Sequence, residues 1–437
     1  MSAVTTEEPN SESNYTFLQI TKPNRGTSVR LEGKIVGFEY FESVYSPMIT
    51  ANMLEADVGG SVADSRTGLR GTLKDALPIE GFEEVSFNIT TRYGELNFTK
   101  NPLIVTGSPM TLDMNGTKQS VLIPMISNYA IQNNLKPLEK VYPEARISDI
   151  VGKILDSLKV PSDKRNIEKT SNVDKVFGNH EPPLDVILQL CKKSIPENGK
   201  DPGYFFFETQ DGFQFRSIEG LINDGIERFD NQGYADSHTY EYFGALDGNL
   251  DNEENNFKVL IPPIVKRDQN ILNALKHGQY NVRVSTLDTL TGEYKEKVEN
   301  LLSSSNLGDK QKIPVDTNNF SKTYSYIINP GADEKGVSEE VLNSPSKYEP
   351  RAQMRYGLLH SQLVEIQIPC NIQLKAGDVI KLKLENITQD EKLLSIYNQH
   401  RSGYYLILHL CHHFDPVNSF TSLTLARDTY GLYTSKK

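Results

Sequence analysis

The sequence has few cysteines and no long apolar run, and both absences restrict the class of protein. Its 437 residues include only three cysteines, Cys191, Cys370 and Cys411, far apart along the chain. This spacing does not form the disulfide framework of small secreted domains and fits a reducing compartment. No segment reaches the roughly 18 apolar residues that a membrane-spanning helix needs, and the first residues lack a basic, apolar leader. The sequence therefore predicts a soluble protein with no membrane partner.

The sequence also lacks an excess of basic residues. It has 46 Lys and Arg against 57 Asp and Glu, a net charge of -11 at pH 7, and no run of five basic residues. Proteins that hold nucleic acid tightly usually show the opposite balance, because Lys and Arg neutralise the phosphates. We therefore expect no tight nucleic-acid binding, whereas an acidic duct through which DNA passes without adhering stays compatible with this composition.

Motifs that would nominate a catalytic residue are also absent from the sequence. It contains no Gly-x-Ser-x-Gly elbow, Walker loop, dinucleotide fingerprint or His-Glu-x-x-His pair. The run that starts at Asp247 has alternating oxygen ligands like a calcium loop, but Asn252 occupies its sixth position and Lys258 its twelfth. We expect no catalytic residue, no cofactor and no metal site.

One histidine-rich run, at 409–413, is the densest candidate for metal chemistry. On a strand, His409, Cys411 and His413 share one face. They would spread along about 13 Å of chain, too far to surround one zinc ion. His412 instead continues the apolar parity of the preceding leucines. The pattern predicts that His412 is buried or interfacial and hydrogen-bonds a neighbouring strand or loop.

A period of two dominates residues 15–127. The apolar parity switches beside Gly37, which predicts a bulge or a barrel corner. The segment 82–89 alternates cleanly from Val85 onward. Such strands, separated by Gly and Asn turns, are typical of an antiparallel barrel or sandwich.

The middle of the chain carries helical spacing. Apolar residues at 147–158 predict a helix with Ser148 as its cap, and a second helix follows Pro182 and Pro183. Aromatic runs at 204–207 and 213–215 flank Asp-Gly, which predicts a hairpin. A short helix near 271–275 is expected to end at Gly278. The polar stretch 298–350 predicts a long excursion on the surface. Another helix is expected from Pro350 to about His360.

The last 75 residues return to a period of two. Leu374-Lys375-Ala376-Gly377-Asp378 precedes one alternating strand, as Leu77-Pro78-Ile79-Glu80-Gly81 precedes an earlier one. Both strands end in Asn-Ile-Thr, at 88–90 and 386–388. By itself this repeated pattern is weak evidence for a duplicated barrel.

The carboxy-terminal segments also carry a family pattern. It consists of Leu374–Ile380, the glycine-aromatic run Ser402–Ile407, His412, and the Thr-rich run Thr421–Asp428, with further matching stretches at Leu77–Ile89, Pro202–Leu221 and Asn270–Asp288. In this order the segments resemble the central baseplate hub protein of contractile-tailed (myovirus) phages, which is related to the amino-terminal part of VgrG. The resemblance marks Gly377, Asp378, Gly403 and His412 as structural candidates.

The resemblance implies a mainly β (α+β) fold with two tail-tube-like β-barrels and an inserted mixed α/β domain. The expected parts are a disordered tail at 1–14, a first barrel at 15–127, the inserted domain at 128–202 and 245–278, a second barrel at 203–244 and 279–430 that includes the polar excursion 298–350, and a tail at 431–437.

The resemblance further implies a structural role without catalysis. A homotrimeric ring would adapt a six-fold tail tube to a three-fold central spike and continue the DNA channel. Its partners would be the tail tube or tube-initiator protein and the central spike protein, with tape measure and wedge proteins as further contacts. The chain would lie in the virion tail baseplate after assembly in the host cytoplasm. The alternatives are another tube- or spike-type tail component on the same barrel, and a hydrolase.

Overall fold

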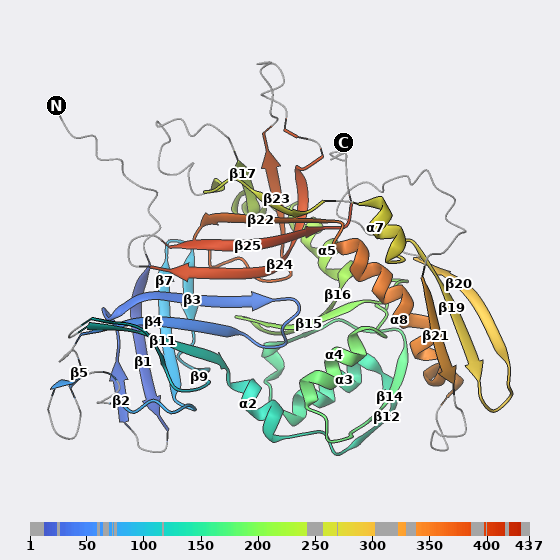
Figure 1. Ribbon diagram of the computed structural model, residues 1–437, viewed down its shortest axis with the longest axis horizontal. Coiled ribbons are helices and arrows are strands. Elements are labelled where there is room, and N and C mark those ends of the chain that lie inside the picture. Colours follow the sequence, from blue (N-terminus) through green and yellow to red (C-terminus); the bar gives the residue numbers. More distant parts are fainter. Residues whose placement is uncertain are drawn as a thin grey trace.

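The computed structural model describes most of the chain (Figure 1). The described residues are 13–23, 27–58, 62–63, 70–71, 73, 77–115, 118–242, 257–268, 270–301, 322–328, 338–385, 397–398, 400–415 and 419–429. Strands make up 46% of the structure and helices 22%, so the mainly β prediction is confirmed. Within these ranges, none of the helices has both the length and the apolar character needed to cross a membrane.

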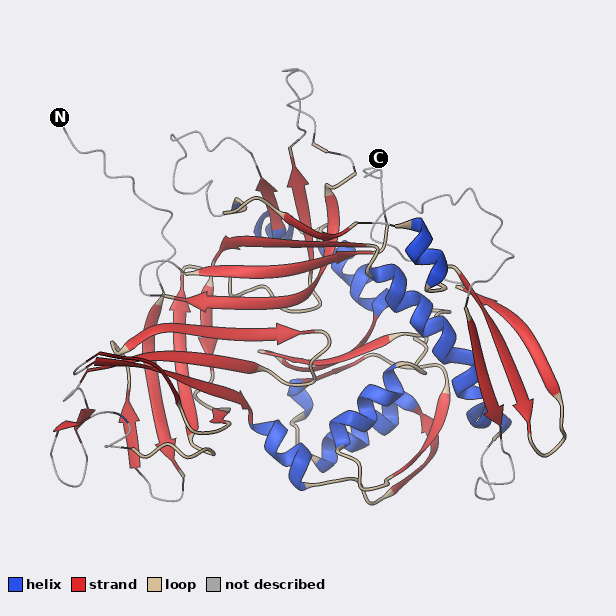
Figure 2. Ribbon diagram, in the orientation of Figure 1, coloured by secondary structure: helices blue, strands red, loops and turns tan. Residues whose placement is uncertain are grey.

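A fifteen-stranded sheet dominates the molecule (Figure 2). Its amino-terminal strands are β1 (Asn14–Lys22), β2 (Thr27–Arg30), β3 (Ile35–Ser43), β4 (Thr50–Val58), β7 (Glu84–Thr91), β8 (Gly94–Asn97), β9 (Leu103–Val105), β10 (Met110–Asn115) and β11 (Lys118–Ser127). Its carboxy-terminal strands are β17 (Thr239–Tyr242), β18 (Ile264–Arg267), β22 (Gln362–Pro369), β23 (Val379–Leu384), β24 (Gly403–Phe414) and β25 (Phe420–Arg427). The main path runs β18-β22-β25-β24-β3-β4-β11-β9-β7-β1-β2. A separate short ribbon pairs β5 (Val62–Ala63) with β6 (Arg70–Gly71).

The two ends of the chain meet at β3 and β24, which lie side by side in Figure 1. These strands pair antiparallel over six residue pairs, from His409 opposite Ser43 to Phe414 opposite Phe38. One apolar core therefore draws on both halves, with Phe38 against Phe414 and Phe87. The described strands hydrogen-bond into one sheet with no closed barrel among them, and the division into two tail-tube-like barrels stays a prediction.

Local predictions in this sheet agree with the structure. The register of β3 against β4 shifts between Ile35 and Gly37, which confirms the predicted bulge. On β7, Val85, Phe87 and Ile89 are all buried while the residues between them are partly exposed, as the alternation predicts.

The middle of the chain forms a mixed unit, part of which lies below the sheet in Figure 1. Its elements are α2 (Asn128–Leu135), β12 (Val141–Arg146), α3 (Ile147–Ser157), η1 (Ser162–Lys164), β13 (Arg165–Ile167), β14 (Val173–Phe177), α4 (Pro183–Cys191), β15 (Tyr204–Thr209), β16 (Gly212–Ser217), α5 (Ile218–Arg228) and α6 (Gln232–His238). Both predicted helices, α3 and α4, are present. The predicted cap is wrong: Arg146 occupies the N-cap position, and Ser148 is buried one residue inside the helix, where it hydrogen-bonds Thr170.

The predicted hairpin is confirmed as β15 and β16, and it does not pair with the described strands of the large sheet. β16 pairs in parallel with β13, so the hairpin belongs to a three-stranded sheet of the mixed unit. All of β15 is buried because its two faces lie in different cores. Tyr204 and Phe206 pack with α3 and α4, whereas Phe205 and Phe207 pack with α5 and the large sheet.

The remaining elements form a small sheet against a long helix, at the right of Figure 1. They are α7 (Ile271–Lys276), β19 (Asn281–Asp288), β20 (Tyr294–Asn300), β21 (Thr323–Ile328) and α8 (Glu339–Leu359). β19 lies between β20 and β21 in a three-stranded sheet that does not pair with the described strands of the large sheet. The excursion at 298–350 contains β21 and more than half of α8. The helix expected from Pro350 therefore begins at Glu339, where the Ser338 hydroxyl accepts from the Val341 N–H.

Several predictions fall on parts of the chain that lie outside the described residues. These are the calcium-like run at 247–256, the Asn-Ile-Thr sequence at 386–388, most of the excursion at 298–350 ahead of α8, and the tail at 431–437. The amino-terminal tail also lies outside them up to residue 12, and β1 already begins at Asn14.

Candidate functional site

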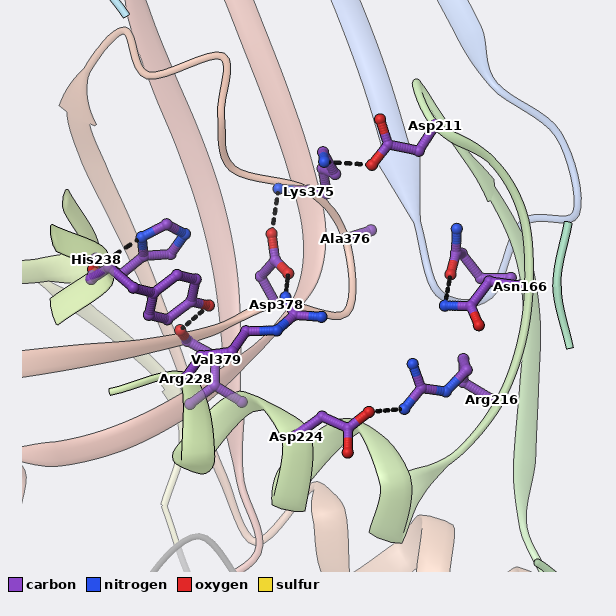
Figure 3. Close-up of polar contacts among 12 residues, drawn as sticks. Asn166, Asp211, Arg216, Asp224, Arg228, His238, Lys375, Ala376, Asp378 and Val379 are labelled. Carbon is purple, nitrogen blue, oxygen red and sulfur yellow. Dashed lines mark hydrogen bonds and ion pairs between the residues drawn. The ribbon is translucent and has the colours of Figure 1, made fainter. Parts of the chain in front are cut away.

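The turn that leads into β23 carries two of the residues marked by the sequence, Gly377 and Asp378. Figure 3 shows Asp378 between Lys375 and Arg228. The Asp378 carboxylate closes the turn by accepting from the backbone N–H of Lys375 at 3.0 Å. Its other oxygen accepts from Arg228 of α5, also at 3.0 Å. Burial raises the pKa of Asp378, and the positive charges of Arg228 and Lys375 oppose that rise. Asp378 therefore connects the turn to the mixed unit.

A small polar pocket of about 130 Å³ lies between this turn, α5 and the β15–β16 hairpin. The six charged side chains that line it form three ion pairs: Lys375 with Asp211, Arg216 with Asp224, and Arg228 with Asp378. Figure 3 shows these pairs extending from three different segments of the chain. Because the charges neutralise one another, the arrangement favours a rigid junction over a substrate site.

Gly377 is a position of close packing in this junction. Its φ of +86° lies in the left-handed region that favours glycine. A Cβ atom there would lie 2.8 Å from the Phe207 ring and 3.3 Å from Leu221. Only glycine lets the turn approach the hairpin this closely.

Gly403 lies away from the turn, where β24 begins opposite Leu382 of β23. Its φ is +140°, and a Cβ atom there would approach the Arg427 guanidinium to 3.1–3.3 Å. Arg427 is fully buried, donates to the Ser402 carbonyl at 3.0 Å and lies over the Tyr405 ring. Gly403 therefore provides room for a buried cation.

His412 is buried on β24, as predicted, with 1% of its surface exposed. Its Nδ1 lies 2.9 Å from the Thr421 hydroxyl on the adjacent strand β25, and its ring stacks on Tyr40. Burial lowers the pKa of His412 to about 3, although a hydrogen bond to the backbone of Leu374 opposes this shift. His412 thus contacts the segment that begins the Gly377 turn, so three of the four marked residues converge there. Within the described ranges, no group of three or more His, Cys, Asp or Glu is arranged to hold a metal ion.

Sequence reasoning missed two buried glutamates beside this junction. Glu42 accepts from the backbone N–H groups of Gln210 at 2.7 Å and Ala376 at 2.9 Å, so it connects β3, the hairpin and the turn. Glu208 accepts from the Ile49 N–H at 3.1 Å and the Ser127 hydroxyl at 2.9 Å. The alternation along β3 could have revealed Glu42, because this residue falls on the positions of the strand whose side chains are buried.

The buried carboxyls make stability depend on pH in a defined direction. Burial raises the pKa of Glu208 from its ordinary 4.5 to about 7. The folded protein therefore keeps a proton that the unfolded chain releases between these values. The contribution of Glu208 to the free energy of unfolding thus falls as pH rises through this interval.

We expect the Glu208→Gln variant to lose this pH dependence. Relative to the variant, the wild-type free energy of unfolding should fall by about 2–3 kcal/mol between about pH 4.5 and pH 8. Urea unfolding of both proteins across this pH range measures the difference between their free energies of unfolding. The pH-dependent contributions that both proteins share, such as that of His412, cancel in this difference. Parallel pH profiles would show that Glu208 is ionised in the folded protein at acid pH.

No family model matches the chain. No curated protein matches it either. Among solved structures, it is similar to the tail protein from Neisseria meningitidis MC58, with 9% identity and a TM-score of 0.51 over 95% of this chain and 97% of that chain. It also aligns with the 43 kDa tail protein of prophage MuSo2 from Shewanella oneidensis, with 6% identity and a TM-score of 0.49 over 95% and 100% of the two chains.

A third solved structure is the E. coli c3393 protein, described as a component of the type VI secretion system with structural similarity to the T4 bacteriophage tail proteins gp27 and gp5. The identity is 10% and the TM-score 0.41, over 92% of this chain and 76% of that chain. The likeness to the Neisseria tail protein shows that this chain shares its fold along nearly the whole length of both chains.

Proposed function

We propose that the chain is a structural subunit of a phage-type tail baseplate, namely its central hub. The observation that carries this proposal is the fold shared with the Neisseria tail protein over 95% of the chain. The order of the carboxy-terminal motifs supports the same assignment, since it resembles hub proteins.

The junction around Gly377 supports a part that works by holding its shape. Two ion pairs, Lys375 with Asp211 and Arg228 with Asp378, and the buried Glu42 connect the large sheet to the mixed unit. In the proposed assembly, three chains form a ring, and each contributes two tube-like halves. Six similar surfaces then face a six-fold tail tube or tube-initiator protein, while the three-fold symmetry of the ring suits a central spike.

The mass of the protein in solution tests this proposal. A hub should give particles of three times the 49.2 kDa chain mass, and electron microscopy should show rings with a central channel. A chain that stays monomeric at micromolar concentration and does not join tube or spike subunits would refute the hub assignment.

We further expect the protein to have negligible affinity for DNA in moderate salt. Each chain of the ring carries a net charge of -11, so an acidic channel would repel phosphates instead of binding them. Filter binding with duplex DNA at about 0.15 M salt measures this affinity. Retention of DNA that weakens steeply as the salt concentration rises would indicate that the protein binds DNA through its phosphates.

A further inference from the structure

A second cavity, of about 260 Å³, lies on the other side of the β15–β16 hairpin, between the loop before β9, the start of α2 and the connection from α3 to β13. Its inner wall combines aromatic and aliphatic side chains with polar ones. Phe98, Leu103 and Phe213 line it beside Ser127 and Glu208, and the Tyr129 ring meets Phe213 edge to face at 5.2 Å. The cavity therefore offers aromatic rings next to polar groups.

Three lysines, Lys100, Lys159 and Lys164, line the same cavity. They come from two different connections, and Lys100 and Lys159 are exposed. Within the described part of the chain, no ion pair or hydrogen bond engages any of the three ammonium groups. Glu208 also lines the cavity and already accepts from Ile49 and Ser127, and Asp163 precedes Lys164 in the chain. In a chain with a net charge of -11, this is a local concentration of unpaired positive charge.

Lys159 also occupies a backbone position that glycine would fill more easily. It follows α3 with a φ of +58°, in the left-handed region, and its N–H donates to the Asp156 carbonyl. Helices commonly place glycine in this conformation after their last turn. A lysine at such a position carries a conformational cost, which is consistent with selection for its charge at the mouth of the cavity.

We propose that this cavity binds a carboxylate attached to an apolar group, presented by a partner polypeptide as an acidic residue next to an aromatic one. The aromatic side chain would pack on Phe98 and Phe213, and the carboxylate would lie among the three lysines. The volume favours a peptide side chain, since pockets for free ligands usually span roughly 300–1,000 Å³. The charge contrast with the acidic remainder of the chain would orient such a partner. This proposal does not depend on the hub assignment.

Ligand-observed saturation-transfer NMR on the full chain tests the proposal, with N-acetyl-Phe-Glu-amide as the probe. We expect binding of this peptide, and about tenfold weaker binding of N-acetyl-Phe-Gln-amide, which lacks the charge. 3-Phenylpropionate carries the same chemistry without a peptide backbone and should bind more weakly than the dipeptide. Tighter binding of the free acid would overturn the assignment to a polypeptide.

Variants show where the probe binds. The triple variant Lys100→Ala, Lys159→Ala, Lys164→Ala should weaken binding about tenfold. A matched control, Lys153→Ala, Lys192→Ala, Lys276→Ala, removes the same charge from exposed positions outside the cavity and should bind as the wild type does. Equal effects of the two triple variants would overturn the site.

A single variant distinguishes the effect of the lost charge on binding from an effect on folding. Lys159→Gly relieves the left-handed backbone, so its unfolding midpoint should stay the same or rise while binding weakens two- to threefold, the scale of one exposed charge contact. Unchanged binding by this variant, with the triple variant also unaffected, would contradict the proposal.

Discussion

Replacing Arg355 by alanine is expected to lower the free energy of unfolding by about 3–5 kcal/mol. Arg355 lies on α8, and its Nη1 is 2.9 Å from the Asp428 carboxylate just beyond β25. The Arg355 side chain is 3% exposed and that of Asp428 is fully buried. Removal of the arginine leaves the charge of Asp428 buried without this partner, and that cost exceeds the loss of an exposed ion pair. Urea unfolding at one fixed protein concentration measures the change.

Arg146→Ala is the matched control for this variant. Arg146 pairs with Glu197 at 3.0 Å, but both side chains are nearly half exposed. Its removal should cost no more than about 1 kcal/mol. Equal losses in the two variants would mean that the contact between α8 and the end of β25 adds little to stability.

The second large effect is expected for Gly377→Ala, which should lower the free energy of unfolding by about 2–4 kcal/mol. The left-handed φ of +86° disfavours alanine, and the added Cβ would lie 2.8 Å from the Phe207 ring, inside van der Waals contact. Because the turn packs on the hairpin, the strain should also separate the ion pairs of the junction. Chemical unfolding gives the size of the effect.

Gly107→Ala supplies the control, because no atom lies within 4 Å of the position where its Cβ would stand. That change should be neutral or slightly stabilising, since alanine restricts the unfolded chain more than glycine does. If both variants unfold at the same urea concentration, the close approach of the Gly377 turn to Phe207 is unimportant for stability.

The sequence by itself determined the local elements of this protein. The parity switch predicted the bulge at Gly37, Asp211-Gly212 predicted the hairpin, and helical spacing predicted α3 and α4. Parity also predicted the burial of His412. These features depend on residues a few positions apart, so periodicity and turn chemistry are enough to reveal them.

Only the tertiary structure decided where those elements go. The pairing of β3 with β24 joins residues more than 360 positions apart, so strands from both ends of the chain share one sheet. The pairing of the hairpin with β13 runs through β16, and alternation within the hairpin does not select that neighbour. Likewise, no local spacing reveals that Glu42 accepts from Gln210 and Ala376, or that Asp428 pairs with Arg355. Such contacts depend on which surfaces meet when the chain packs, and that is a property of the whole fold.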